Sequence, residues 1–184
     1  FVRAPASEVR IDSAFRQVIE ACARTPRDGQ AGTWIVPQMV AAYTEWQRRG
    51  RVHSFETWID GQLVGGLYGV AIGRMFFGES MFAWASDASK IALAGLVAFS
   101  RQHGITLIDC QVHTDHLERF GAHEVTRAEF LTRLRLALDH PTRPDAAQID
   151  ADQHCDRDGR KDRGCRPRAA PHRDPSAPSA SSIR

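Results

Sequence analysis

The sequence has little cysteine, and none of it is arranged for metal or disulfide chemistry. Its four cysteines are Cys22, Cys110, Cys155 and Cys165, and no two of them form a CxxC pair. Cys22 and Cys110 lie in apolar segments, where a free cysteine packs as a small core residue. We therefore expect a protein of a reducing compartment, without a disulfide framework.

Long apolar runs and a strong charge imbalance are also missing. No apolar run approaches the roughly 20 residues that a membrane span needs, and residues 1–10 (FVRAPASEVR) have no apolar centre of the kind a signal peptide carries. The net charge of +2 does not by itself indicate nucleic-acid binding. These absences predict a cytoplasmic protein with no membrane partner. Because the chain begins with Phe rather than Met, we expect residues 1–11 to be the remnant of a linker or N-terminal region.

Phosphate-binding and metal-binding motifs are absent as well. The glycines of LVGGLYG (63–69) are followed neither by a helix nor by Lys-Ser/Thr, which excludes a P-loop and a dinucleotide fingerprint. Glycines within a strand indicate close approach by another backbone or by a ligand. CQVHTDH (110–116) spaces Cys110, His113 and His116 by three residues, which is not a zinc spacing. The sequence thus predicts no metal.

Composition divides the chain near Leu138. Between residues 139 and 184 the only aliphatic side chains larger than Ala are Ile149 and Ile183, and six of the nine prolines fall there. Such a segment cannot bury enough apolar area to offset the entropy of ordering. We expect a disordered tail over 139–184 and a folded part over 12–138.

The folded part alternates helical and strand patterns. The first helix is expected at 12–23, with Asp12 or Ser13 as its N-cap. Further helices are expected at 37–50, 89–104 and 127–138, and a short helix followed by a turn is expected at 115–125. Strands are expected at 53–59, 62–72, 74–82 and 105–112, with a hairpin turn at the Asp-Gly of 60–61. This order predicts an α/β layer with a mixed sheet flanked by helices. It resembles the GNAT-like acyltransferase fold, in which two central parallel strands, here 74–80 and 105–111, splay apart around the substrates.

Glu79 raises a question, because RMFFGESMF (74–82) surrounds it with side chains that favour burial. A buried carboxylate is costly unless it is paired or hydrogen-bonded. It could form an ion pair with Lys90 or an arginine, or it could line a pocket for a cation. The preceding Gly78 favours a β-bulge that would turn the side chain toward a cleft.

A second polar pair ends the last strand, in LIDCQ (107–111). Asp109 and Gln111 are two residues apart, so in a strand they would share a face and could hydrogen-bond, although a strand end entering a polar loop gives the same pattern. Cys110 would point the opposite way, which argues against a thiol nucleophile. Trp34 follows a loop and could stack on a base or anchor the core. Arg48, Arg49 and Arg51 suit the end of a helix dipole and could also touch phosphate.

An ordered set of motifs is similar to the C-terminal domain of the bacterial leucyl/phenylalanyl-tRNA–protein transferase family. The set consists of GTWI (32–35), AY (42–43), HSFETW (53–58), LVGGLYGV (63–70), FFGESMF (76–82), ASK (88–90), LIDCQ (107–111) and HLERFGAHEV (116–125). The resemblance covers about residues 12–138. It implies a GNAT-like domain that transfers Leu, Phe or Met from aminoacyl-tRNA to proteins beginning with Arg or Lys, for the bacterial N-degron pathway.

The resemblance also implies roles for individual residues. Gln111 would accept the proton of the attacking α-amine, Asp109 would polarise Gln111, and Glu79 would face the acceptor's basic N-terminus. Trp34 would stack on the terminal adenosine of the tRNA. Leu67, Phe76 and Met81 would line the pocket for the transferred side chain, and Ser80 is expected to bind substrate. No cofactor and no metal are implied, and a monomer is expected.

Some features depart from the family. Its N-terminal domain, with FPW and WWSP segments, does not precede Phe1, and two pocket positions that are often aromatic are Leu96 and Ser100. An alternative is therefore a catalytically inactive fragment that binds tRNA 3′ ends or basic N-termini. An acetyltransferase using coenzyme A is disfavoured, because the R/Q-x-x-G-x-G/A pyrophosphate loop is missing between Phe82 and Lys90.

Overall fold

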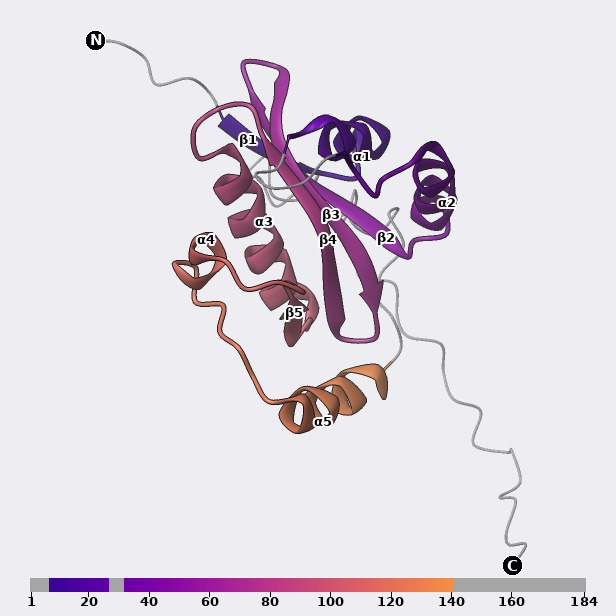
Figure 1. Ribbon diagram of the computed structural model, residues 1–184, viewed down its shortest axis with the longest axis vertical. Coiled ribbons are helices and arrows are strands. Elements are labelled where there is room, and N and C mark those ends of the chain that lie inside the picture. Colours follow the sequence, from indigo (N-terminus) through magenta and orange to yellow (C-terminus); the bar gives the residue numbers. More distant parts are fainter. Residues whose placement is uncertain (1–6, 27–31, 141–184) are drawn as a thin grey trace, which may run out of the picture.

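Five strands form one mixed sheet in the computed structural model, which describes residues 7–26 and 32–140 (Figure 1). Strands β1 to β4 pair antiparallel in chain order, and β5 pairs parallel with β4. The elements are β1 (Ser7–Ile11), α1 (Phe15–Arg24), α2 (Pro37–Arg48), β2 (Val52–Ile59), β3 (Gln62–Ile72), β4 (Met75–Ala83), α3 (Ala88–His103), β5 (Leu107–Asp109), α4 (Asp115–Glu118) and α5 (Arg127–Leu138).

Helices cover both faces of this sheet (Figure 1). On one face, α1 and α2 close a core that includes Val18, Ile19 and Tyr68. On the other face, α3 closes a second core, which includes Phe55 and Leu96. Such a layered arrangement buries the apolar side of each element. The expected α/β class, the antiparallel meander and the parallel pairing of the strands at 74–80 and 105–111 are confirmed.

The folded part starts earlier than expected. Residues Ser7–Ile11 lie in the predicted linker remnant, but they form β1, and every residue of β1 pairs with β2. The expected tail begins with Asp139 and His140, and its remaining residues, 141–184, lie outside the described part of the chain, as do residues 1–6. No helix in the described ranges combines the length and apolar character needed to cross a bilayer.

The predicted N-cap of α1 is wrong. Ala14 holds that position without a side-chain cap, while the Asp12 carboxylate accepts the backbone N–H of Ser54 at 2.8 Å and contacts His53 Nδ1 at 2.6 Å. Ser13 donates its hydroxyl to Glu56 of β2. The side chains of both predicted caps therefore bond to β2 and do not cap α1. The Glu56 carboxylate of β2 accepts the Ala14 N–H at 2.7 Å instead.

Strand glycines allow close backbone approach, as predicted. A Cβ on Gly65 would lie 2.5 Å from the Cβ of Ala88, at the start of α3. A Cβ on Gly69 would lie 2.2 Å from the carbonyl oxygen of Phe77 in β4. These distances are far inside van der Waals contact, so both positions require glycine for the packing of β3.

Candidate functional site

Glu79 is the extra residue of a β-bulge in β4. The ladder with β3 passes from the pair Tyr68–Ser80 directly to the pair Gly69–Gly78, which leaves Glu79 without a partner. A bulge reverses the alternation of the strand, and the core contacts show the reversal. Before it, Phe76 packs on the α3 side, and after it, the odd-numbered Met81 does so. The bulge expected from Gly78 is confirmed.

The partner of Glu79 is Tyr43 of α2. Burial, the negative charge of Glu79 and a hydrogen bond to that carboxylate, in decreasing order, raise the pKa of Tyr43 to about 12. The phenol thus stays protonated at neutral pH and donates to the carboxylate. Lys90, which was expected as an alternative partner, pairs with Asp87 at 2.5 Å. Glu79 is half-buried rather than enclosed in a core.

Trp34 reaches the same place from the loop before α2. Its ring meets Tyr43 edge to face, with centroids 6.4 Å apart, and the residue is 44% exposed. The reading of Trp34 as a core anchor is therefore wrong. Tyr43 connects an exposed indole to the bulged carboxylate, and it is not among the predicted site residues, although the AY motif contains it. The only local signal was a tyrosine on a helix face beside small residues.

Asp109 and Gln111 meet through the backbone instead of across a strand face. β5 ends at Asp109, and Gln111 follows in a left-handed conformation (φ 61°), so strand alternation does not relate the two side chains. The Asp109 carboxylate accepts the backbone N–H of Gln111 at 2.8 Å. This is the bond of an Asx turn, which holds the backbone of Gln111 at the end of β5.

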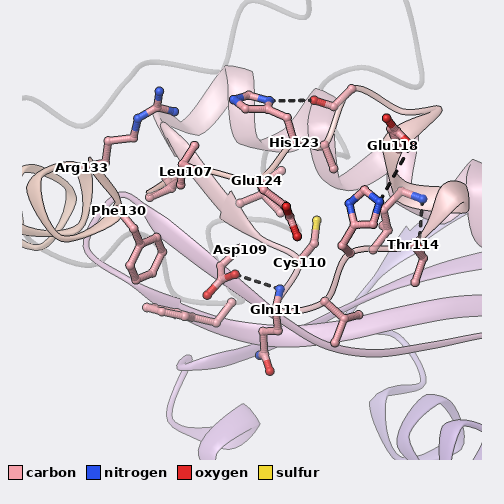
Figure 2. A pocket seen from close by; sticks show the side chains of 18 of the residues that line it. Leu107, Asp109, Cys110, Gln111, Thr114, Glu118, His123, Glu124, Phe130 and Arg133 are labelled. Carbon is pink, nitrogen blue, oxygen red and sulfur yellow. Dashed lines mark hydrogen bonds and ion pairs between the residues drawn. The ribbon is translucent and has the colours of Figure 1, made fainter. Parts of the chain in front are cut away.

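A hollow of about 960 Å³ opens at this turn (Figure 2). Asp109, Cys110 and Gln111 line it from the end of β5. Phe130 and Arg133 of α5 lie on one side of it, and Glu118 of α4 lies on the other (Figure 2). Its lining is mixed in character and contains acidic, basic and apolar side chains. Glu79 does not contribute to its lining.

Cys110 is not an activated nucleophile. Burial, and secondarily the neighbouring charge of Asp109, raise the pKa of its thiol. A raised thiol pKa lowers the thiolate fraction and hence the reactivity. Cys110 packs against the α3-side core, which supports its expected role as an apolar filler.

The side chains that could ligate a metal do not form the Cys110, His113 and His116 triplet of the sequence. His113 groups with Asp115 and Glu118, whose ligand atoms all lie within 4.8 Å of one another, and not with Cys110 and His116. All three residues are exposed. Exposed carboxylates of this kind are satisfied by water, so the group does not indicate a metal centre.

The residues expected to line the side-chain pocket lie together on the α3 side. Leu67 and Met81 face each other across the ladder, and Phe76 belongs to the same core as Leu67. Leu67 and Phe76 are only 3% and 1% exposed, so they belong to the buried core beneath this region and not to its accessible surface. Leu96 of α3 is buried against them. Ser80 lies beside the bulge, opposite Tyr68.

Two comparisons with known proteins bear on this geometry. The family model for leucyl/phenylalanyl-tRNA protein transferase matches residues 1–135. The leucyl/phenylalanyl-tRNA–protein transferase of Leptothrix cholodnii is 61% identical over 145 residues, which is 79% of this chain and 57% of that protein. The protein of the same name from Methylibium petroleiphilum is 66% identical over 130 residues, 71% of this chain and 49% of its own length. The chain thus spans about half the length of these relatives.

Solved structures support the fold. A predicted acetyltransferase with acetyl-CoA from Clostridium acetobutylicum superposes with a TM-score of 0.51 at 11% identity, covering 66% of this chain and 93% of that one. At such an identity the likeness concerns architecture alone, and it confirms the expected GNAT-like fold. Since the family model covers most of the chain and close relatives carry the same name, this chain belongs to the leucyl/phenylalanyl-tRNA protein transferase family.

Proposed function

We propose that this chain transfers Leu, Phe or Met from aminoacyl-tRNA to the N-terminal α-amine of proteins that begin with Arg or Lys. The family match over residues 1–135 carries the proposal. We propose that it works in the cytoplasm as a monomer, feeding the bacterial N-degron pathway.

The reaction is aminolysis of an ester. The α-amine nitrogen bonds to the ester carbonyl carbon, the bond from that carbon to the ribose oxygen breaks, and the adenosine hydroxyl leaves. The amine must lose a proton and the leaving oxygen must gain one. An activated ester needs little beyond positioning and proton transfer. The chemistry therefore fits a site with an amide, a carboxylate and no cofactor.

In our proposal Gln111 receives the amine proton through its side-chain oxygen. Asp109 acts as its positioning residue, because its carboxylate holds the turn that directs Gln111. Glu79 faces the cationic side chain of the acceptor, with the Tyr43 hydroxyl as its internal donor. Trp34 stacks on the terminal adenosine, which its exposure allows. Leu67, Phe76, Met81 and Ser80 serve the transferred amino acid. An apolar pocket discriminates weakly between similar side chains, so several can be accepted.

Mass spectrometry of an Arg-initiated peptide, incubated with Phe-tRNA and this chain, tests the proposal. The expected product is heavier by one Phe residue, and the same peptide with an acetylated N-terminus stays unchanged. Glu79→Gln should lower transfer at least about tenfold by removing the charge that pairs with the acceptor. Asp60→Asn is the matched control, because Asp60 is exposed at the β2–β3 turn, where Asn also tolerates the positive φ of 49°.

The same assay on a chain extended to the full length of the relatives separates two failures. Transfer by the longer chain alone would assign the present chain to the binding fragment considered above. No transfer by either form would contradict the proposed function.

A further inference from the structure

An exposed aromatic and basic surface lies at the C-terminal end of α2, away from the hollow at β5. We call it the α2 basic face, made of Trp46, Arg48, Arg49 and Arg51. Trp46 is 49% exposed, although a tryptophan side chain gains more from burial than most others. Trp46 and Arg49 are three residues apart on one helix and are therefore neighbours on its surface. Arg51 lies two residues after Arg49, and its backbone N–H donates to the Trp46 carbonyl at 3.0 Å.

Positive charge is in excess on this face. Arg48 and Arg49 share one carboxylate, that of Glu45, at 3.6 and 2.9 Å. Arg51 forms no ion pair with any residue of the described ranges 7–26 and 32–140. The α2 basic face thus carries three arginines, and Glu45 is the acid that pairs with two of them. Exposed pairs such as those of Glu45 are weak, and an incoming anion can replace them at little cost.

Aromatic contacts join the face to Trp34. The Trp34 ring meets Tyr43 at 6.4 Å, and Tyr43 meets Trp46 at 6.0 Å, both edge to face. Two exposed indoles therefore stand on either side of one tyrosine. A strand of nucleic acid that stacks a base on Trp34 would bring its next nucleotides toward Trp46 and the arginines.

This combination of groups fits RNA. Guanidiniums bind phosphates through paired N–H donors, and an exposed indole offers a face on which a base can stack. An acidic polypeptide would use the arginines but not the indole. We propose that the α2 basic face binds the RNA body of aminoacyl-tRNA, with Arg48, Arg49 and Arg51 on phosphates and Trp46 on an unpaired base. This inference rests on the proposed function, and it adds a second contact beyond the aminoacyl end.

Binding of a labelled RNA hairpin, which carries an acceptor stem and a single-stranded 3′ end, tests the proposal. The double variant Arg49→Ala/Arg51→Ala should weaken binding, and the slope of log affinity against log salt should shrink by about 1.5, since each lost phosphate contact removes about 0.7–0.9. Trp46→Ala should weaken binding at least about fivefold, and Trp46→Phe should restore most of the loss. Glu45→Gln should strengthen binding, because it frees two arginines.

Arg16→Ala provides the matched control. Arg16 lies on α1 and pairs with Glu20 at 2.8 Å with the same i,i+4 spacing as Arg49 and Glu45, in the opposite order along the chain, and its side chain is similarly exposed, 72% against 68%. Its loss should leave hairpin binding unchanged. Equal binding by the wild-type chain and the double variant would overturn the proposal, and so would an equal loss in Arg16→Ala. Preferential binding of polyglutamate, independent of Trp46, would overturn it in favour of an acidic polypeptide.

A minimal donor separates this proposal from the proposed function. Phenylalanyl-adenosine has no RNA body, so Arg49→Ala/Arg51→Ala and Trp46→Ala should transfer from it as the wild-type chain does, while their transfer from Phe-tRNA falls. Equal losses with both donors would contradict the α2 basic face as an RNA contact. Face-dependent hairpin binding without transfer from either donor would instead contradict the proposed function alone.

Discussion

Two carboxylates of the same sheet, Glu79 and Glu56, have opposite surroundings. Glu56 of β2 is fully buried and accepts hydrogen bonds from Ser13, Ala14, Ser54 and Trp58. Glu79 is half-buried and accepts from Tyr43. A carboxylate with four donors is satisfied within the protein, whereas a half-buried one that accepts from a phenol can still bind a cation. This difference is why Glu79, and not Glu56, is the candidate for the acceptor's charge.

The Tyr43–Glu79 contact predicts the titration of Tyr43. The chain has two tyrosines, so the difference in absorbance near 295 nm between wild type and Tyr43→Phe isolates Tyr43. Its pKa should lie at about 12. Glu79→Gln removes the charge and should lower that pKa, which stays above 10.0 because burial is the largest cause. An unchanged titration in Glu79→Gln would contradict the contact.

The same shift predicts how stability depends on pH. Between pH 10.0 and about 12 the folded chain retains a proton on Tyr43 that the unfolded chain has lost. The free energy of unfolding should therefore fall as pH rises through this window, and the contribution is fully present below it. Urea unfolding at several pH values should show a shallower fall for Tyr43→Phe than for wild type. Parallel curves would show that Tyr43 does not contribute.

At the scale of elements, the bulge in β4 depends on the glycine opposite to it. Gly69 pairs with Gly78 across the ladder, and a Cβ on Gly69 would lie 2.2 Å from the Phe77 carbonyl oxygen and 2.5 Å from the Phe76 ring. A backbone carbonyl cannot move aside as a flexible side chain can. An added Cβ on Gly69 would therefore force β3 and β4 apart next to the bulge that carries Glu79.

Gly69→Ala should therefore destabilise the fold by about 2–4 kcal/mol, at or above the upper range of overpacking. Chemical denaturation measures this change. Gly78→Ala is the control from the same ladder pair, because its Cβ would meet only the Asp109 carbonyl oxygen, at 3.3 Å. We expect a smaller loss there. Equal stability of Gly69→Ala and wild type would show that the strands have room to move at the bulge.

At the scale of the whole molecule, Glu56 joins α1 to the sheet. Its carboxylate bonds to the start of α1 and to side chains of β2, more than 40 residues apart in sequence. Glu56→Gln replaces one acceptor oxygen by an NH₂ group, which leaves buried donors facing a donor. The expected loss is about 2–4 kcal/mol in the free energy of unfolding, since each buried donor without a partner costs about 1–3 kcal/mol.

Glu20→Gln is the comparison for Glu56→Gln. Glu20 lies on α1 in an exposed pair with Arg16, so its loss should change the free energy of unfolding by less than about 0.5 kcal/mol. Urea denaturation of both variants gives the two values. Similar small losses would mean that α1 is held to the sheet by apolar packing alone.

Local pattern determined much of this protein. Apolar periodicity located α2, α3 and α5 within a few residues, the Asp-Gly pair located the β2–β3 turn, and Gly78 predicted the bulge. Each of these depends on neighbours within a few residues along the chain, where side-chain spacing and backbone preference act directly. The ordered motifs also identified the family from the sequence alone.

Contacts between distant segments decided the rest. The local pattern predicts Asp12 and Ser13 as helix caps, but their side chains bond to residues of β2. Ser7–Ile11 form a strand because they pair with the edge of β2. Gln111 lies outside the strand, in a turn where its backbone N–H bonds to the Asp109 carboxylate. Tyr43 contacts Glu79 because the fold places α2, which packs on α1 and β2, within hydrogen-bond reach of the bulge. A polar side chain takes whichever partner the fold brings within hydrogen-bond distance, and that choice is not written in its neighbours in sequence.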